Sequence, residues 1–167
     1  TGDVRVFQML GTPGASPAID RRKGFEEEIA KTPRIKIVQS QDGDFKRARG
    51  KEVMEAFLKT PEGKTINALY AHNDDMALGA IQALKEAGMK PGTEVKIVSI
   101  DGVKAAFQAM VAGELNCTVE CNPLLGPQMF DLVEKIVAGQ DVPKRVVVEE
   151  GVYDESEAAK VLPTRKY

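Results

Sequence analysis

The sequence has little of several residue types, and each shortage excludes a class of protein. Its 167 residues include two cysteines, Cys117 and Cys121, one histidine and no tryptophan. Two cysteines are too few for a disulfide-stapled fold, and no His or further Cys lies near them at metal-ligand spacing. On one extended strand they would lie about 13 Å apart, too far for a mutual disulfide. The cysteines therefore do not decide the compartment.

An excess of one charge and a long apolar run are also missing. The chain has 23 Lys and Arg against 25 Asp and Glu, and its basic clusters, residues 21–23 and 46–49, are short. Such clusters cannot follow a phosphate backbone, so we expect no nucleic-acid partner. No apolar run approaches the ~20 residues that span a bilayer, and the first residues lack the regions of a signal peptide. We expect a soluble chain.

The residues that are abundant favour one ordinary α/β domain. With 43% hydrophobic and 29% charged residues, the chain can bury a real core. Short runs rich in β-branched residues alternate with longer segments of helical period, which predicts a doubly wound parallel sheet with helices on both faces. The expected strands are nearly continuous apolar runs, as in strands covered on both faces, at residues 4–10, 35–39, 68–71, 95–100 and 116–120.

Start and stop signals delimit the helices between these strands. Ser16 and Pro17 predict a cap and a first turn for a helix over residues 17–31. Asp44 is a plausible N-cap for a second helix, and Asn73 precedes a third that ends before Gly88. A short fourth helix is expected over residues 104–112.

The composition changes near residues 122 and 123, where we expect a boundary. A helix over residues 123–138 follows, and it carries an apolar stripe that needs cover, formed by Leu125, Met129, Leu132, Val133 and Ile136. A strand is expected over residues 145–149, followed by a polar tail, residues 154–167, with little core of its own.

Ligands of an open parallel sheet bind outside the carboxyl ends of its strands, so the residues just past each strand are the informative ones. They are residues 11–16 with the following Arg21, then 42–45, 72–75, 101–102 and 121–122. This set combines carboxylates, a carboxamide, a guanidinium and an aromatic ring. Such a mixture suits a polyhydroxylated ligand, because sugar hydroxyls both donate and accept and an aromatic ring covers the apolar C–H face.

Each of these residues also has a purely structural interpretation. Asn73 and Asp44 can be N-caps only, Arg21 a solvated charge and Phe45 part of the core. His72 has no Ser or Cys nucleophile beside it, and we expect it to be structural. Residues 11–14 lack the pattern of a phosphate loop.

A metal site is the less favoured interpretation of the acidic residues in this set. Asp74 and Asp75 with Asp101 could bind a metal, but adjacent acids in a helix's first turn are usually partners of its dipole. We expect no metal.

Several segments together resemble a known family. They are Gly24-Phe25 after an Arg-bearing helix, Asp44-Phe45, Asn-Asp-Asp-Met-Ala-Leu-Gly-Ala at 73–80, Val-Ser-Ile-Asp-Gly at 98–102 and Gly-Glu-Leu at 113–115. In this order they resemble the type I periplasmic sugar-binding proteins of ABC transporters. Residues 118–128 and 165–167 look most like the galactofuranose-binding and ribose-type branch.

The resemblance implies a sugar held between two lobes, without cofactor or catalysis, and delivered to a membrane permease from the periplasm. Residues 1–122 would be the C-terminal lobe, and residues 123–167 would return to an N-terminal lobe that is mostly missing. The sugar contacts carried over are Arg21, Phe45, Asn73 and Asp101. The next contact, often a Gln, falls at Cys121, where Glu120 or Asn122 could substitute.

Two other functions stay open. A sugar-responsive repressor core shares the Asn-Asp-x-Met-Ala pattern, but the strand endings at residues 100–102 and 120–123 favour the transporter protein. A small enzyme using His72, Asp74 and Asp101 is the alternative from another class, because triads are recognised by geometry and not by sequence order. An uncovered apolar stripe would find cover on the first lobe, on a second copy in a homodimer, or through partial disorder.

Overall fold

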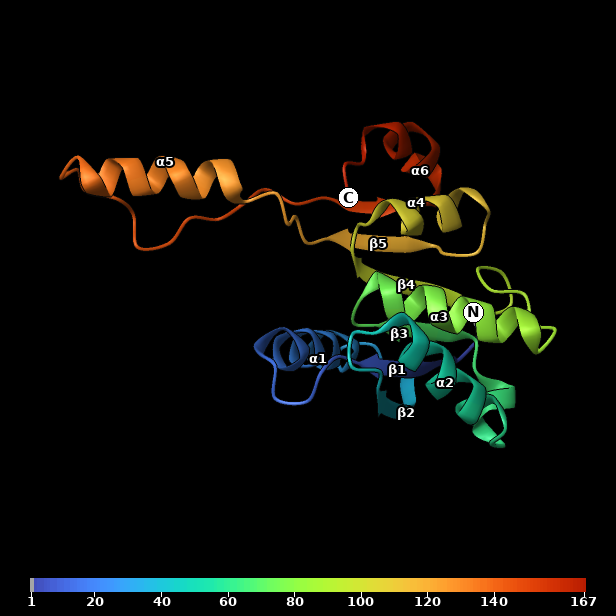
Figure 1. The fold of residues 1–167 in the computed structure, drawn as a ribbon. Coiled ribbons are helices and arrows are strands. Elements are labelled where there is room, and N and C mark those ends of the chain that lie inside the picture. The colour runs from blue at the N-terminus through green and yellow to red at the C-terminus, as the bar shows by residue number, and fades with distance from the viewer. Residues whose placement is uncertain (1) are drawn as a thin grey trace.

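The computed structural model describes residues 2–167 and contains one six-stranded sheet (Figure 1). The strands are β1 (Val4–Leu10), β2 (Ile35–Asp42), β3 (Ala68–Ala71), β4 (Lys96–Asp101), β5 (Cys117–Glu120) and β6 (Val152–Asp154). Their order in the sheet is β2-β1-β3-β4-β5-β6, and only β6 runs antiparallel to its neighbour. The expected α/β class and its parallel sheet are confirmed.

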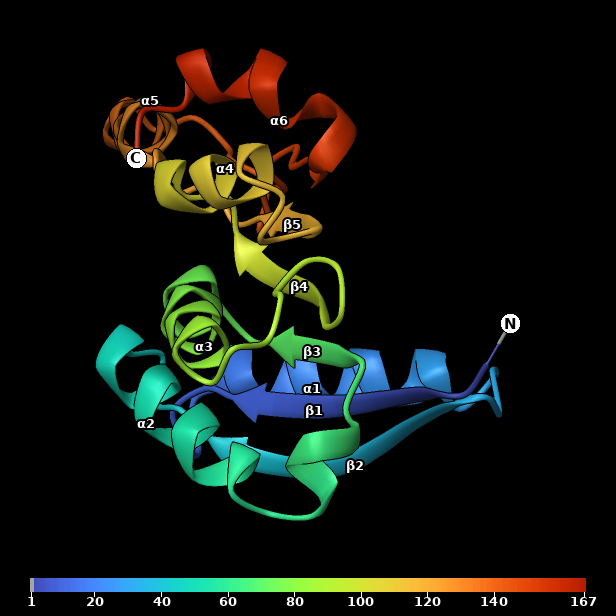
Figure 2. The same ribbon diagram turned by 90° about the vertical axis from the view of Figure 1, so that its right-hand side faces the viewer.

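Helices cover both faces of this sheet. They are α1 (Ser16–Ile29), α2 (Arg47–Leu58), α3 (Asp74–Glu86), α4 (Lys104–Val111), α5 (Gly126–Val137) and α6 (Glu155–Val161), with short 3₁₀ turns at Glu62–Thr65 and Leu162–Thr164. On one face Phe25 of α1 stacks on Tyr70 of β3, with 4.1 Å between ring centroids. On the other, Phe57 of α2 stacks on Phe7 of β1 at 3.9 Å. Helices α3 and α4 lie on the same side as α2 (Figure 2).

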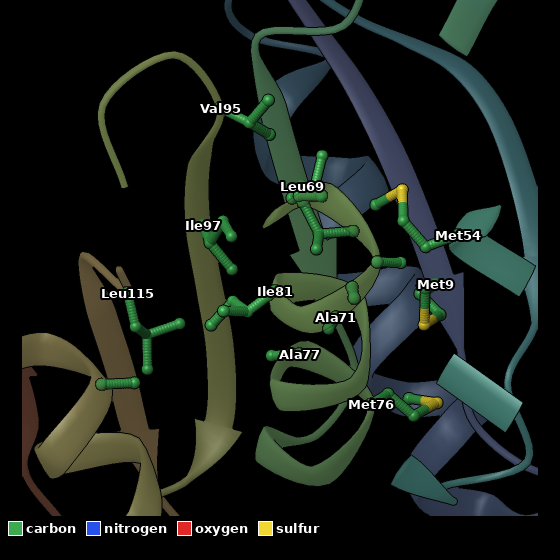
Figure 3. Close-up of a cluster of buried hydrophobic side chains, with 14 of the residues drawn as sticks. Met9, Met54, Leu69, Ala71, Met76, Ala77, Ile81, Val95, Ile97 and Leu115 are labelled. Carbon is green, nitrogen blue, oxygen red and sulfur yellow. The ribbon is translucent and has the colours of Figure 1, made fainter. Parts of the chain in front are cut away.

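The main core lies between the sheet and helices α2, α3 and α4. Met9 of β1, Leu69 and Ala71 of β3 and Ile97 of β4 point into this layer, and none of these four leaves more than 1% of its surface exposed (Figure 3). Met9, Leu69 and Ile97 represent the three strands in this layer. They meet Ala77 and Ile81 of α3.

Helices α2 and α3 cross so closely that their contact requires glycine on both. A Cβ on Gly79 would lie 2.1 Å from the carbonyl oxygen of Arg47, and a Cβ on Gly50 would lie 2.6 Å from that of Met76. Both helices therefore meet backbone to backbone at the side of the sheet where the strands end.

The tail differs from expectation. No strand forms over residues 145–149; the sheet is completed instead by β6, which pairs with the edge of β5. A strand needs a neighbour for its backbone groups, and residues 145–149 lie on an excursion from the sheet where none is available. The tail has little core of its own: among residues 154–167 only Ala158 is buried, and it packs into the main core beside the partly buried Val161 and Leu162.

Three helix starts also differ. Helix α1 begins at Ser16 after Ala15, so Ser16 is not its cap. Asp44 is not the cap of α2, because its backbone is left-handed (φ 57°) and its carboxylate accepts instead from the Thr12 hydroxyl at 2.8 Å. Helix α5 begins at Gly126 and not at 123, with proline in its first turn.

Helix α5 projects away from the rest of the molecule (Figure 1). None of its residues is buried, and its apolar side chains are open to solvent, Phe130 at 71% and Met129 at 60%. In the part of the chain that the structure describes, every helix is too short or too polar to cross a bilayer.

The close helix crossing predicts opposite effects for two glycine substitutions. Gly79→Ala should lower the free energy of unfolding by about 3 kcal/mol, because the methyl group collides with backbone that cannot move alone. Gly24→Ala, in the exposed middle of α1 with nothing within 4 Å, should raise it by about 0.5–1 kcal/mol. Urea unfolding of both variants measures this. Equal effects in the two variants would contradict the crossing.

Candidate functional site

The carboxyl edge of the sheet brings together four of the residues predicted from the sequence. Arg21 of α1 reaches across the strand ends, where its guanidinium donates to the carbonyl oxygen of His72 and lies 3.4 Å from the carboxylate of Asp101. The same guanidinium stands 5.7 Å from the ring centroid of Phe45. Asn73 joins the group through its side-chain nitrogen, which donates to the carbonyl of Phe45 at 3.2 Å.

Asn73 serves two structural bonds at once. Its side-chain oxygen accepts from the backbone N–H of Met76 at 3.0 Å, which caps α3, while its nitrogen holds Phe45. The N-cap interpretation is therefore correct. It does not exclude a ligand contact, because a carboxamide has two lone pairs and two N–H groups.

Phe45 is placed by an unusual turn after β2. Its own φ is 56°, following Asp44 at 57°, so two residues with side chains occupy the left-handed region. Its ring lies over Gly11, where a Cβ would come within 2.0 Å of it. Gly11 therefore leaves the space in which the ring lies beside Arg21.

Asp101 ends β4 in a strained conformation, with φ at 129°. Burial raises the pKa of its carboxyl to about 6, against the opposing effect of Arg21. The nearby charge of Asp74 adds to the rise. The site thus holds a carboxylate that is short of partners.

Asp74, for which the sequence predicts a role as a helix-dipole partner, lies buried behind this edge and supports it. Its carboxylate accepts from the hydroxyls of Ser99 on β4 and Thr118 on β5, and from the N–H of Val103 at 2.8 Å. Burial raises its pKa, while these hydrogen bonds favour the charged form. The sequence signal for this network is that two successive predicted strands each carry a hydroxyl residue, Ser99 and Thr118, near their carboxyl ends.

The residues at the end of β5 are arranged differently. The side chain of Cys121 is exposed, and its backbone N–H donates to the carbonyl of Asp101 at 3.0 Å. The carboxylate of Glu120 is occupied by Arg165 and Tyr167, both at 2.7 Å. The side chain of Asn122 accepts from the N–H of Leu124.

His72 and the acidic residues do not form the catalytic group that the sequence left open. Burial and the neighbouring Arg21 charge lower the pKa of His72 to about 4, so its ring is neutral at physiological pH. Its Nδ1 accepts from the N–H of Gly11 at 3.3 Å. Asp74 is committed to Ser99 and Thr118. Within residues 2–167 no three His, Cys, Asp or Glu side chains are grouped to hold a metal.

The site therefore offers a guanidinium, a carboxylate and a carboxamide beside one aromatic ring. Charge-assisted donors and acceptors of this kind bind hydroxyl groups, and the ring supplies an apolar surface. The arrangement is suited to binding and has no activated nucleophile.

The raised pKa of Asp101 predicts a pH-dependent gain from Asp101→Asn. An acid whose pKa rises on folding, here from 3.8 to about 6, destabilises the folded state increasingly as the pH rises through this window. At pH 7 the variant should be more stable by about 1–2 kcal/mol, and the gain should vanish near pH 4. Urea unfolding at both pH values measures it, with the exposed Asp20→Asn as control. A gain equal at both pH values would contradict the assignment.

Comparison with known proteins gives a consistent result. The model of the periplasmic binding protein domain matches residues 1–141. The galactofuranose-binding protein YtfQ of Escherichia coli is 51% identical over 144 residues, which are 86% of this chain and 45% of that protein.

Two solved structures agree with this match. A Mycobacterium smegmatis protein in complex with β-D-fucofuranose has a TM-score of 0.94 at 51% identity, and the alignment covers 100% of this chain and 54% of that one. The binding protein of a Shewanella arabinose ABC transporter, bound to L-arabinofuranose, has a TM-score of 0.92 at 46% identity, with 99% and 55% covered.

The chain thus spans about half the length of the relatives that it matches. The named relatives are binding proteins and not enzymes. The matched domain model, the identity to YtfQ and the shared fold together show that the chain belongs to the type I periplasmic binding proteins, the family of the sugar-binding components of ABC transporters.

Proposed function

We propose that the chain forms one lobe of a protein that binds a monosaccharide between two lobes and delivers it to the permease of an ABC importer, in the periplasm. The observation that carries the proposal is the meeting of Arg21, Phe45, Asn73 and Asp101 at the carboxyl edge of the sheet. Relatives at 46–51% identity are bound to furanose sugars, which favours a furanose ring as the ligand here.

In this proposal each side chain has a role that its surroundings permit. Arg21 and Asp101 hydrogen-bond neighbouring hydroxyls, Asn73 contributes its second N–H and lone pair, and Phe45 covers the C–H face of the sugar. Cys121 lies at the same edge, and its exposed side chain is the least defined of the contacts. The repressor core and the enzyme are the functions that this proposal replaces.

Calorimetric titration of the complete two-lobed protein tests the proposal. Asp101→Ala should cost about 1.5–3 kcal/mol of sugar affinity, as expected for a hydrogen bond to a charged group. Arg21→Lys should weaken binding nearly as much as Arg21→Ala. The planar guanidinium bonds the carbonyl of His72 and the carboxylate of Asp101 at the same time, and an ammonium group cannot reproduce this geometry.

The matched control is Arg49→Lys, on the exposed side of α2, which should leave affinity unchanged. A panel of furanose and pyranose sugars identifies the ring form. Full affinity in both Asp101→Ala and Arg21→Lys would refute the site.

The domain division is a second part of the proposal. We propose that the boundary near residue 122 separates this lobe from an excursion, residues 123–151, whose helix α5 covers the sheet of the other lobe. The exposed stripe of α5 supports it, since uncovered apolar side chains forgo roughly 1.5–3 kcal/mol each. The expected second segment, residues 123–167, is thus shortened: we assign residues 152–167 to this lobe, because β6 pairs with β5 and α6 packs beside α4.

An uncovered stripe predicts that the 167-residue chain alone associates with a second copy. Met129→Glu should shift the chain toward monomer in light scattering coupled to size exclusion, because it places a charge in the stripe at a side chain that is 60% exposed. Glu134→Gln, on the same helix, is the control and should not. A wild-type chain that is monomeric at high concentration would speak against an apolar contact surface on α5.

A further inference from the structure

The turn that carries Asp101 is held on every side by hydrogen bonds. The carbonyl of Asp101 accepts from Cys121, the N–H of Gly102 donates to Thr118 at 3.2 Å, and the N–H of Val103 donates to Asp74 at 2.8 Å. A residue in a sparsely populated backbone region persists only where its surroundings fix it in this way. The first part of the turn is therefore fixed from the sheet side.

The C-terminal tail supplies the remaining side. The backbone N–H of Lys104 donates to the carbonyl oxygen of Tyr167 at 2.6 Å. The guanidinium of Arg165 lies against Gly102, because a Cβ on that glycine would come within 3.1 Å of its Nη2. Two residues of the tail thus contact the same short turn from outside the sheet.

Arg165 is itself fixed more strongly than a surface arginine. Its side chain is 7% exposed and is bonded to Glu120 at 2.7 Å. Its guanidinium stands over the rings of Phe107, Tyr153 and Tyr167, at 4.9, 5.7 and 4.6 Å from their centroids. A planar guanidinium can make these stacks and the ion pair together, whereas an ammonium cannot.

Glu120 completes the connection. It also accepts from the Tyr167 hydroxyl, and hydrogen bonds from Tyr167 and Arg165 outweigh burial, so that the pKa of Glu120 lies below its ordinary value. Glu120 ends β5, immediately before the chain leaves the sheet toward α5. The cluster therefore joins the C-terminal tail, the exit of the chain from β5 and the turn after β4.

We propose that Arg165 and Tyr167 are positioning residues, which clamp the strained Asp101–Gly102 turn and so hold the Asp101 carboxylate where a ligand meets it. The clamp itself is a property of this chain. Its effect on ligand affinity rests on the function proposed above.

Hydrogen exchange on the 167-residue chain, without sugar, tests the clamp. Arg165→Lys keeps the positive charge but loses the planar guanidinium and its contacts with the three aromatic rings. We expect about tenfold faster exchange at the amides of Gly102, Val103 and Lys104, with amides of β1 and β3 unchanged. Tyr167→Phe, a milder change that removes one hydroxyl, should act in the same direction. Arg49→Lys is the charge-matched control and should leave these amides unchanged.

A merely structural role predicts a uniform loss of protection across the sheet, and that result, or no change at these amides, overturns the proposal. In the complete protein, Arg165→Lys should lower sugar affinity about tenfold, because binding must then restore the strained turn. If Asp101→Ala abolishes binding while Arg165→Lys leaves affinity intact, the positioning role is wrong and the proposed function stands. If Asp101→Ala also has no effect, the proposed function fails, and the exchange data alone decide the clamp.

Discussion

The buried carboxylate of Asp74 is the constraint on which the site depends. It lies at the first turn of α3 and accepts from Ser99, Thr118 and Val103, which belong to β4, β5 and the start of α4. A buried charge is tolerable only if its hydrogen bonds are made. The ends of β4 and β5 and the start of α4 must therefore lie at fixed positions around the Asp74 carboxylate. Removing either hydroxyl would leave the buried charge with one hydrogen bond fewer and would loosen the strand ends that carry the residues proposed to meet the ligand.

The edge of the sheet that is proposed to meet the ligand also contains strained backbone, which the rigid surroundings hold in place. Asp44, Phe45 and Asp101 all adopt positive φ angles. Phe45 and Asp101 are themselves proposed to meet sugar, and Asp44 directly precedes Phe45. A carboxyl with a raised pKa and a backbone in sparsely populated regions both cost folding free energy. Such costs are found at functional sites, where a bound ligand relieves them, and they are offset here by the core between the sheet and helices α2, α3 and α4.

The sequence was sufficient for features that depend on local pattern, and insufficient for those that depend on a distant partner. Strand runs, the cap at Asn73 and the meeting of Arg21 with Asp101 follow from periodicity and the strand-end rule. By residue type, residues 145–149 suit a strand as well as residues 152–154 do. Only residues 152–154 reach the free edge of β5, and the sequence does not reveal which segment does so. Asp74 and Asp75 look alike in sequence, yet one is buried and the other pairs with Arg47 at the surface. Arg165 gave no signal of its own, because its aromatic neighbours come from three elements.

The position of β6 also sets the timing of folding. β5 precedes β6 in the chain, and the long segment between them must loop back before the sheet can be completed. Until it does, β5 presents unpaired backbone groups at the sheet edge. Closing so long a loop costs chain entropy before its contacts form. The pairing of β6 with β5 is therefore the step of sheet formation that we expect to be slowest.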